Sequence, residues 1–187
     1  MRRAFLCILL FCSCFPGVFA PTLARGQGRQ ADSPASNVIL RVNGEVEHPL
    51  QLSSAEVAKL PRHTARTIDH GGVEAAFEGT PLVEMLRLAG AKLGEQLRGQ
   101  EMTTYVLVKA ADNYQVVFAV AELDSGFTDR VIFLADRRDG NPLSAKEGPL
   151  RIIVPGEKRH ARWVRQVTSL TLIHAGAKSL TESKSPE

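Results

Sequence analysis

Residues 148–167 read Gly-Pro-Leu-Arg-Ile-Ile-Val-Pro-Gly-Glu-Lys-Arg-His-Ala-Arg-Trp-Val-Arg-Gln-Val. The apolar run 150–154 has the length and β-branched content of a buried strand, and Pro155-Gly156 ends it with a turn. Such a strand can deliver a cationic loop whose side chains and backbone amides bind phosphate or another anion. The same pattern fits a solvated basic turn with a tryptophan packed into the core. The loop holds Lys158, Arg159, Arg162, Arg165 and the only tryptophan, Trp163.

The bulk composition is that of a soluble globular protein with one domain of ordinary size. The chain has 187 residues, of which 44% are hydrophobic and 23% charged, and its formal net charge is +3. The basic residues gather late in the sequence instead of forming a stripe along it. We therefore predict no nucleic-acid partner.

Residues 1–24 are predicted to be a signal peptide. Arg2 and Arg3 form a positive start, and residues 5–15 form an apolar stretch that is too short to span a bilayer comfortably. We expect cleavage after Ala24 and an exported, periplasmic protein. The paired arginines also match part of a twin-arginine signal, so both that route and general secretion stay open.

The cysteines have a restricted distribution. Cys7, Cys12 and Cys14 all lie inside the predicted signal peptide, so the mature chain would contain no cysteine. It would have no disulfide, no thiolate metal ligand and no thiol nucleophile. Loss of Arg2 and Arg3 leaves 21 of the 23 basic residues against 20 acidic ones, so the mature protein would be nearly neutral.

The predicted domain spans residues 38–175, between a flexible lead (25–37) and a disordered tail (176–187). Roughly eight short strands and two helices are expected, which predicts a mixed, β-rich α+β fold. Residues 103–110 and 114–120 are expected to form a hairpin, residues 91–100 a loop and residues 121–127 a single helical turn. The first helix begins after Ser53, whose spacing to a glutamate three residues on matches a capping box. The second is expected to begin at Thr80-Pro81, with Thr80 as its N-cap.

Asp69-His70 at a predicted strand end, beside Gly71-Gly72, is a candidate site. A carboxylate and an imidazole next to a glycine pair are well placed to face a ligand. A turn in which Asp69 accepts neighbouring backbone amides explains the residues equally well. None of the five histidines pairs with another at a metal-ligand spacing, so no metal site is predicted.

Four segments, in order, resemble the oxidoreductase molybdopterin-binding domain of the sulfite oxidase family. The order and spacing of their motifs agree over residues 38–173, nearly the whole predicted mature chain. The resemblance implies that family's mixed α+β fold and a pocket that faces molybdopterin. The segments are Asp112-Asn-Tyr114, Phe133-Leu-Ala-Asp-Arg-Arg-Asp-Gly-Asn-Pro-Leu143, Gly148-Pro-Leu-Arg-Ile-Ile-Val-Pro155 and Arg162-Trp-Val164.

The resemblance also implies roles for individual residues. Asp69 and His70 would lie at the metal side of the pocket as candidate catalytic residues. A guanidinium suits a phosphate because its planar donors can engage two oxygens at once. The candidate cofactor-binding residues are His63, Asp112, Asn113, Tyr114, Lys158, Arg159, Arg162 and Trp163.

One departure from the family pattern affects the predicted activity. Family enzymes bind molybdenum through a cysteine thiolate in a loop that should fall near residues 67–71, where this chain has none. Asp69 could offer an oxygen ligand instead. Two functions therefore remain open: an exported molybdopterin-dependent oxidoreductase or a degenerate member, and a non-catalytic module that binds a small anion or a partner protein. A domain that works with a redox or membrane partner is a third possibility.

Overall fold

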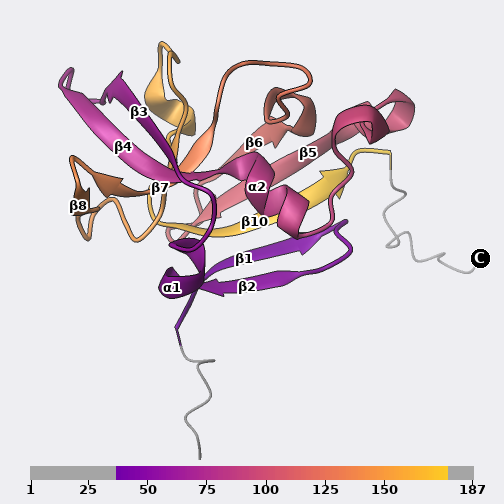
Figure 1. Ribbon diagram of the computed structural model, residues 1–187, viewed down its shortest axis with the longest axis horizontal. Coiled ribbons are helices and arrows are strands. Elements are labelled where there is room, and N and C mark those ends of the chain that lie inside the picture. Colours follow the sequence, from indigo (N-terminus) through magenta and orange to yellow (C-terminus); the bar gives the residue numbers. More distant parts are fainter. Residues whose placement is uncertain (1–36, 177–187) are drawn as a thin grey trace, which may run out of the picture. The chain divides into compact units, whose positions relative to one another are not determined.

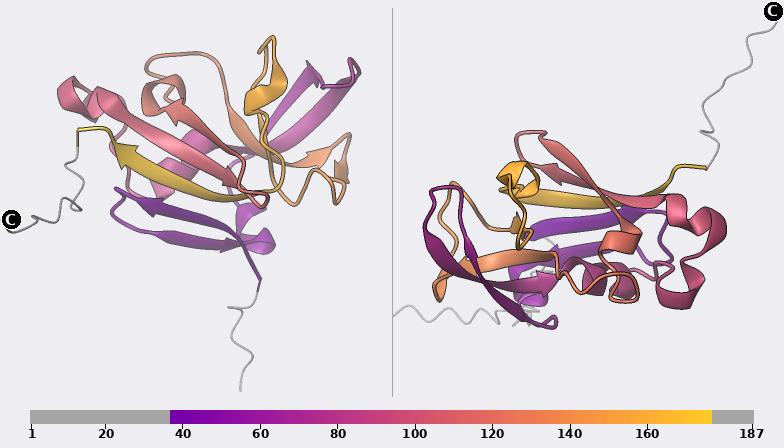
Figure 2. Two further views of the ribbon diagram at one scale, coloured as in Figure 1. Left: turned by 180° about the vertical axis from the view of Figure 1, so that it is seen from behind. Right: turned by 90° about the horizontal axis from the view of Figure 1, so that it is seen from above.

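The computed structural model describes residues 37–176, whose strands form two five-stranded sheets (Figures 1 and 2). The predicted signal peptide and nearly all of the predicted lead and tail lie outside these residues. No helix within residues 37–176 is long and apolar enough to cross a membrane. The strands are β1 (Val38–Gly44), β2 (Leu50–Ser53), β3 (His63–Ile68), β4 (Glu74–Pro81), β5 (Thr104–Ala110), β6 (Gln115–Ala119), β7 (Phe133–Arg138), β8 (Asn141–Pro142), β9 (Arg151–Ile153) and β10 (Val167–His174).

The first sheet has the order β2-β1-β10-β5-β6. Its centre is β10, which pairs in parallel with β1 and antiparallel with β5. Along β5, buried residues alternate with half-buried ones, as expected for a strand with one face against a core. The first and last strands described are therefore neighbours, and β5 and β6 form the hairpin that the sequence predicted.

The second sheet has the order β3-β4-β7-β8, with β9 paired to β7 as well. All three residues of β9 are buried, including the charged Arg151. One continuous hydrophobic core contains residues of both sheets, among them Val108 and Leu170 of the first and Phe77 and Ile152 of the second. The sheets therefore share a core, as a two-layer domain requires.

Two short α-helices connect the strands. The helix α1 (Ser54–Val57) begins with the predicted capping box, in which Ser53 and Glu56 bond each other's backbone amide. The helix α2 (Leu82–Leu88) starts later than predicted, and Thr80 as its N-cap is wrong. Thr80 pairs with Leu134 inside β4, and the Leu82 amide still donates to the Ile132 carbonyl at 3.0 Å, so sheet pairing holds this stretch extended.

Four 3-10 turns complete the described residues. The predicted helical turn over residues 121–127 is instead a 3-10 turn three residues long, and the predicted loop over 91–100 contains another. The predicted α+β class is confirmed, with ten strands rather than roughly eight. The turns are η2 (Gly94–Gln96), η3 (Gly99–Thr103), η4 (Val120–Glu122) and η5 (His160–Arg162).

The parallel pairing of β1 with β10 yields a stability prediction. Gly44 has a φ of +91°, and a Cβ added there would lie 2.1 Å from the Leu172 carbonyl oxygen of β10. Gly44→Ala should lower the free energy of unfolding by about 2 kcal/mol or more, because the clash is with backbone and the φ is unfavourable. Urea denaturation measures this change.

Gly71→Ala is the matched control, since nothing lies within 4 Å of a Cβ added at Gly71. Its stability should stay within about 0.5 kcal/mol of the wild type. A similar loss in both variants would contradict the assigned close approach of β1 to β10.

Candidate functional site

A cavity of about 470 Å³ opens where the β5–β6 hairpin, the β3–β4 loop and residues 160–166 meet. Its volume lies within the range of small-molecule sites. Beside the ion-paired Arg151, the lining has the exposed cations Lys146 and Arg165 against the single carboxylate of Asp112, which suits an anionic ligand. The charged and histidine side chains that line it are His70, Asp112, Lys146, Arg151, His160 and Arg165.

Arg151 is the most unusual of these residues because it is charged and only 1% exposed. Its Nη2 donates to Asp69 Oδ1 at 2.8 Å, and its Nη1 donates to Glu147 Oε1. The guanidinium carbon lies 5.4 Å from the ring centres of both Phe77 and Trp163. Two carboxylates and two aromatic faces thus offset the loss of water around this buried charge.

Asp69 is buried at the end of β3, and its carboxylate accepts three hydrogen bonds. Besides Arg151, the His70 amide donates to Oδ1 at 2.7 Å and Arg138 Nη1 donates to Oδ2 at 2.7 Å. Burial by itself raises the pKa of Asp69, but the bonds from Arg151 and His70, with the charges of Arg151 and Arg138, lower the pKa below its usual value. Asp69 is therefore held as a carboxylate.

Both interpretations of Asp69 from the sequence can now be compared. Asp69 does accept the neighbouring amide of His70, as a local turn would require. Its other contacts come from Arg138 and Arg151, 69 and 82 residues away along the chain. His70 is exposed and lines the cavity, while Asp69 lies behind it against Arg151. The catalytic roles suggested for the two residues stay predictions.

One donor of Arg151 has no acceptor. Its Nε is buried and has no hydrogen-bond partner among the described residues. An unmade hydrogen bond on a buried donor is costly, and a charged donor more so. Because Arg151 borders the cavity, an anionic or carbonyl-bearing ligand there would be well placed to supply the missing acceptor.

Aromatic side chains form one wall of the cavity. Trp163 is 4% exposed and donates from Nε1 to the Val154 carbonyl at 3.1 Å, so it is the core side chain that the sequence suggested. The His160 ring lies 4.2 Å from the Trp163 ring and 6.1 Å from that of His70. A planar aromatic ligand could pack against the faces and edges of these rings.

The β5–β6 turn closes another side. Asp112 Oδ1 accepts the Tyr114 amide at 2.9 Å, and Asn113 has a φ of +69°, a value that asparagine tolerates. The Tyr114 hydroxyl donates to the Ala161 carbonyl at 2.8 Å and so joins this turn to η5. Asp112 and Tyr114 line the cavity as predicted candidates, and Asn113 supplies the turn.

Four other predicted cofactor-binding residues are not among those that line this cavity. The His63 ring packs against Phe133 at 5.0 Å and borders a different cavity. Lys158 and Arg159 are exposed. Arg162 donates to Glu157 at 2.7 Å and to Glu122 at 3.1 Å, so its charge is already paired. Their cofactor roles stay predictions.

The sequence did not single out three of the charged or histidine residues of the cavity. These are Lys146, Arg151 and His160, which come from a turn, a strand and the 3-10 turn η5 that folding brings together. Arg151 did leave a signal, because it is the one charged residue within the apolar run 150–154. A charge on a buried strand indicates a paired or functional group.

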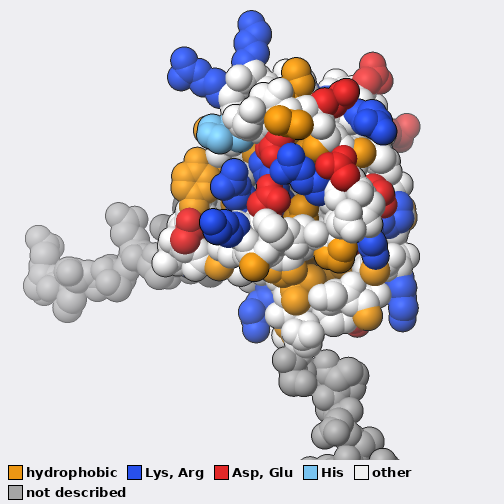
Figure 3. Space-filling view, turned by 90° about the vertical axis from the view of Figure 1, so that its left-hand side faces the viewer, with side chains coloured by type: hydrophobic (Ala, Val, Ile, Leu, Met, Phe, Trp, Pro, Cys, Tyr) orange, Lys and Arg blue, Asp and Glu red, His pale blue; other side chains and the backbone are white. Residues whose placement is uncertain are grey.

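The face that carries the β3–β4 hairpin and β8 is shown in Figure 3. Basic and acidic side chains alternate near its centre, and a histidine lies at its margin. Charge of both signs in one area indicates local pairing, as in the pair of Arg62 with Asp136 at 2.6 Å. The described part of this face therefore shows mixed charge and not one extended cationic surface.

The side chains present fit one part of a molybdopterin cofactor and not the other. The cations, the unpaired Arg151 Nε and the aromatic wall suit a phosphate-bearing, planar heterocycle. Residues 37–176 contain no cysteine, the residue type through which the family resemblance implies that molybdenum is bound. The only carboxylate at the expected metal side, that of Asp69, is committed to two arginines.

Comparisons with known proteins agree on one group. Residues 28–180 match the family described as the oxidoreductase molybdopterin binding domain. The crystal structure of the sulfane dehydrogenase SoxCD from Paracoccus pantotrophus is similar, with a TM-score of 0.58 and 20% sequence identity. The match covers 75% of this chain and 39% of that one, so this chain spans well under half of it. No curated protein matches the chain.

The lowered pKa of Asp69 predicts how stability depends on pH. In the unfolded chain an aspartate has a pKa of about 3.9, and in the fold the pKa of Asp69 is lower. Its ionised form therefore stabilises the fold above pH ~4, and that contribution is lost as the pH falls through the folded-state value. The free energy of unfolding should therefore fall as the pH drops below about 5.

Asp69→Asn should be less stable than the wild type at neutral pH and should lose less stability over the acid window. Exposed Asp129→Asn serves as the matched control and should keep the wild-type slope. Urea titrations at several pH values measure these slopes. An unchanged slope in Asp69→Asn would show that Asp69 is not stabilised as a carboxylate.

Proposed function

Because this chain belongs to the oxidoreductase molybdopterin-binding domain family, we propose that its cavity binds an anionic, pterin-type ligand and that binding, not protein-ligated metal chemistry, is its main role. The family match and the similar solved structure confirm the family resemblance of the four sequence segments. Similarity to the sulfane dehydrogenase at 20% identity concerns the fold, and no activity is transferred from it.

The observation that carries this proposal is the unpaired Nε of Arg151. The rest of that guanidinium is fixed by Asp69 and Glu147, so Nε keeps one orientation in a side chain that borders the cavity. Lys146 and Arg165 add exposed positive charge at the same opening. A phosphate oxygen or a ring carbonyl would satisfy the buried donor, and the ligand plane would pack beside His160 and Trp163.

The part of molybdopterin that these residues would hold is the organic one. Lys146, Arg151 and Arg165 would bind its acceptor groups, and His70 and His160 would border its ring system. When the cofactor is bound, its metal supplies the redox chemistry. Asp69 orients Arg151 through their ion pair, and this function does not require Asp69 to leave its arginine partners.

An oxidoreductase is the second candidate, favoured by the position of Asp69 and His70 next to the cavity. The two candidates differ in what the purified protein contains. Molybdenum and pterin in near-equal amounts would support the enzyme, whereas pterin without metal would support the binding domain. Elemental analysis and fluorescence of the oxidised extract provide these values. A folded protein that contains neither and binds no anion would contradict both candidates.

Removal of the two exposed cations at the cavity tests the binding role. Lys146→Ala and Arg165→Ala should each weaken phosphate binding about tenfold, because each removes a charge-assisted contact. The pterin content of each variant isolated from cells should also be lower than that of the wild type. Isothermal titration with inorganic phosphate measures the first effect.

Arg98→Ala is the matched control, because Arg98 lies between η2 and η3 and is not among the cavity-lining residues. It should bind phosphate like the wild type. If phosphate binding were weakened equally in all three variants, it would depend on the net charge of the protein alone, and the assigned site would be wrong.

We also propose that the protein is exported to the periplasm, since residues 1–24 have the pattern of a signal peptide. The mature chain should then begin at Arg25, which N-terminal sequencing of the periplasmic protein can establish. Replacement of residues 5–15 by a polar sequence should keep the protein in the cytoplasm. A redox or membrane partner remains a hypothesis for pull-down experiments on the exported form.

A further inference from the structure

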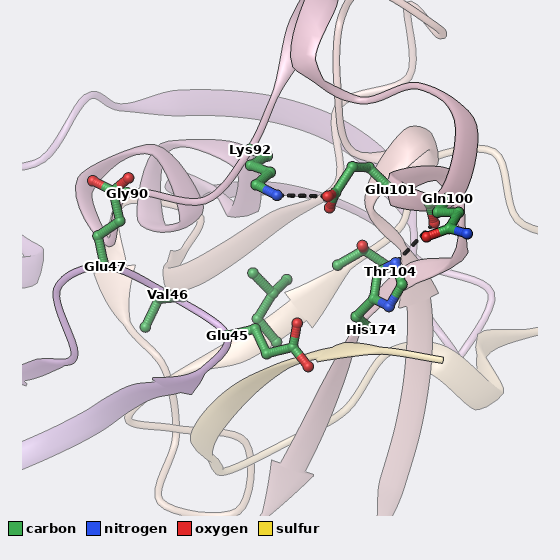
Figure 4. A pocket seen from close by; sticks show the side chains of 10 residues that line it. Glu45, Val46, Glu47, Gly90, Lys92, Gln100, Glu101, Thr104 and His174 are labelled. Carbon is green, nitrogen blue, oxygen red and sulfur yellow. Dashed lines mark hydrogen bonds and ion pairs between the residues drawn. The ribbon is translucent and has the colours of Figure 1, made fainter. Parts of the chain in front are cut away.

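A second cavity, of about 390 Å³, lies at the other end of the first sheet (Figure 4). Gln166, just before β10, lines the first cavity, and His174, the last residue of β10, lines the second. Eight residues of extended strand separate the two by roughly 25 Å. The second cavity draws its walls from the β1–β2 connection, the end of α2, η3, and the ends of β5 and β10.

Carboxylates outnumber cations in this second cavity. Glu45, Glu47 and Glu101 face it, against the single lysine Lys92. Lys92 is already paired with Glu101 at 2.5 Å. Glu47 lies 3.9 Å from His48 Nε2, but both side chains are largely exposed, so the pair is weak. Glu45 and Glu47 therefore leave an excess of negative charge at the opening.

A buried hydroxyl in the same cavity lacks a partner. Thr104 is 8% exposed and lines the cavity, and its Oγ1 has no hydrogen-bond partner among residues 37–176. Figure 4 shows its side chain beside the Lys92–Glu101 pair, with Glu45 on the other side of the same space. A buried hydroxyl usually has a hydrogen-bond partner. A ligand that donates a hydrogen bond to Thr104 Oγ1 would supply the missing partner.

The wall next to Thr104 is fixed in place. His174 Nε2 lies 2.9 Å from the Gln100 carbonyl oxygen and 3.3 Å from Thr103 Oγ1. With the proton on Nε2, the ring donates to that carbonyl and joins η3 to β10. The cavity thus has a preformed wall, which reduces the entropy lost on binding.

The chemistry of the lining selects one kind of cation. The described residues contain no group of three or more side chains arranged to hold a metal ion, so an inorganic divalent cation is disfavoured. In Figure 4 Glu47 is drawn at the end of the cavity away from Thr104, whereas Glu45 and Glu101 flank Thr104. Acidic groups at both ends match a ligand with two separated positive charges.

We propose that this cavity binds an aliphatic diamine or polyamine. One ammonium group is held at the Glu45 and Thr104 end, where Thr104 Oγ1 accepts one of its N–H groups. The other ammonium group lies near Glu47, and the methylene chain runs along Val46 and Leu172. The site is separate from the anion cavity and does not depend on the function proposed for it.

Isothermal titration of the purified full chain with putrescine and spermidine tests the site. Both should bind saturably, and the monoamine butylamine should bind about tenfold more weakly because it lacks the second charge. Glu45→Gln should weaken putrescine binding about tenfold. Thr104→Val should weaken it about fivefold, since it removes one neutral acceptor and nearly keeps the shape of the side chain.

Glu95→Gln is the matched control, because Glu95 lies in the nearby η2 turn and is not among the lining residues. It should bind putrescine like the wild type. The proposal is overturned if neither amine binds at millimolar concentration, if butylamine binds as well as putrescine, or if Glu95→Gln weakens binding as much as Glu45→Gln does. Glu45 is exposed, so its variant remains informative even if Thr104→Val folds poorly.

Discussion

The rest of the domain depends on the ion pairs that the buried guanidinium of Arg151 forms with Asp69 and Glu147. Arg151 lies in a strand that is buried throughout, and it stays charged there because Asp69 and Glu147 bond it and two aromatic rings face it. Removing one partner from such a buried group typically costs about 3–5 kcal/mol, since the opposite charge is left unpaired. The network therefore constrains the end of β3, the turn before β9 and β9 itself together.

This network also decides what the neighbouring cavity can do. The family resemblance implies a metal ligand near residues 67–71, where Asp69 lies, yet Arg138 and Arg151 already use the carboxylate oxygens of Asp69. A carboxylate whose pKa is lowered by two guanidinium groups is a better anchor for those groups than a ligand or a base. The same pairing leaves the Nε of Arg151 without a hydrogen-bond partner among the described residues, in a side chain that borders the cavity.

The first sheet carries a cavity at each end, and the two have opposite electrostatic character. Lys146, Arg151 and Arg165 border the cavity near the start of β10, whereas Glu45 and Glu47 border the one at its end. The strands between them are continuous, and the alternating burial of β5 keeps one face in the shared core. A rigid sheet can thus hold two dissimilar sites far enough apart for charge to be screened between them.

The sequence by itself determined the α+β class, the family, the capping box at Ser53 and the β5–β6 hairpin, because each depends on local pattern or on motifs in order. It also indicated that Asp112 and Tyr114 would border a pocket, while their role there stays a prediction. Only the tertiary structure decided that Asp69 pairs with Arg151, that Arg162 is occupied by Glu122 and Glu157, and that Thr80 stays in a strand. These outcomes depend on contacts between residues far apart in the chain, which no local spacing encodes, and on competition among charges for partners that folding alone brings within reach.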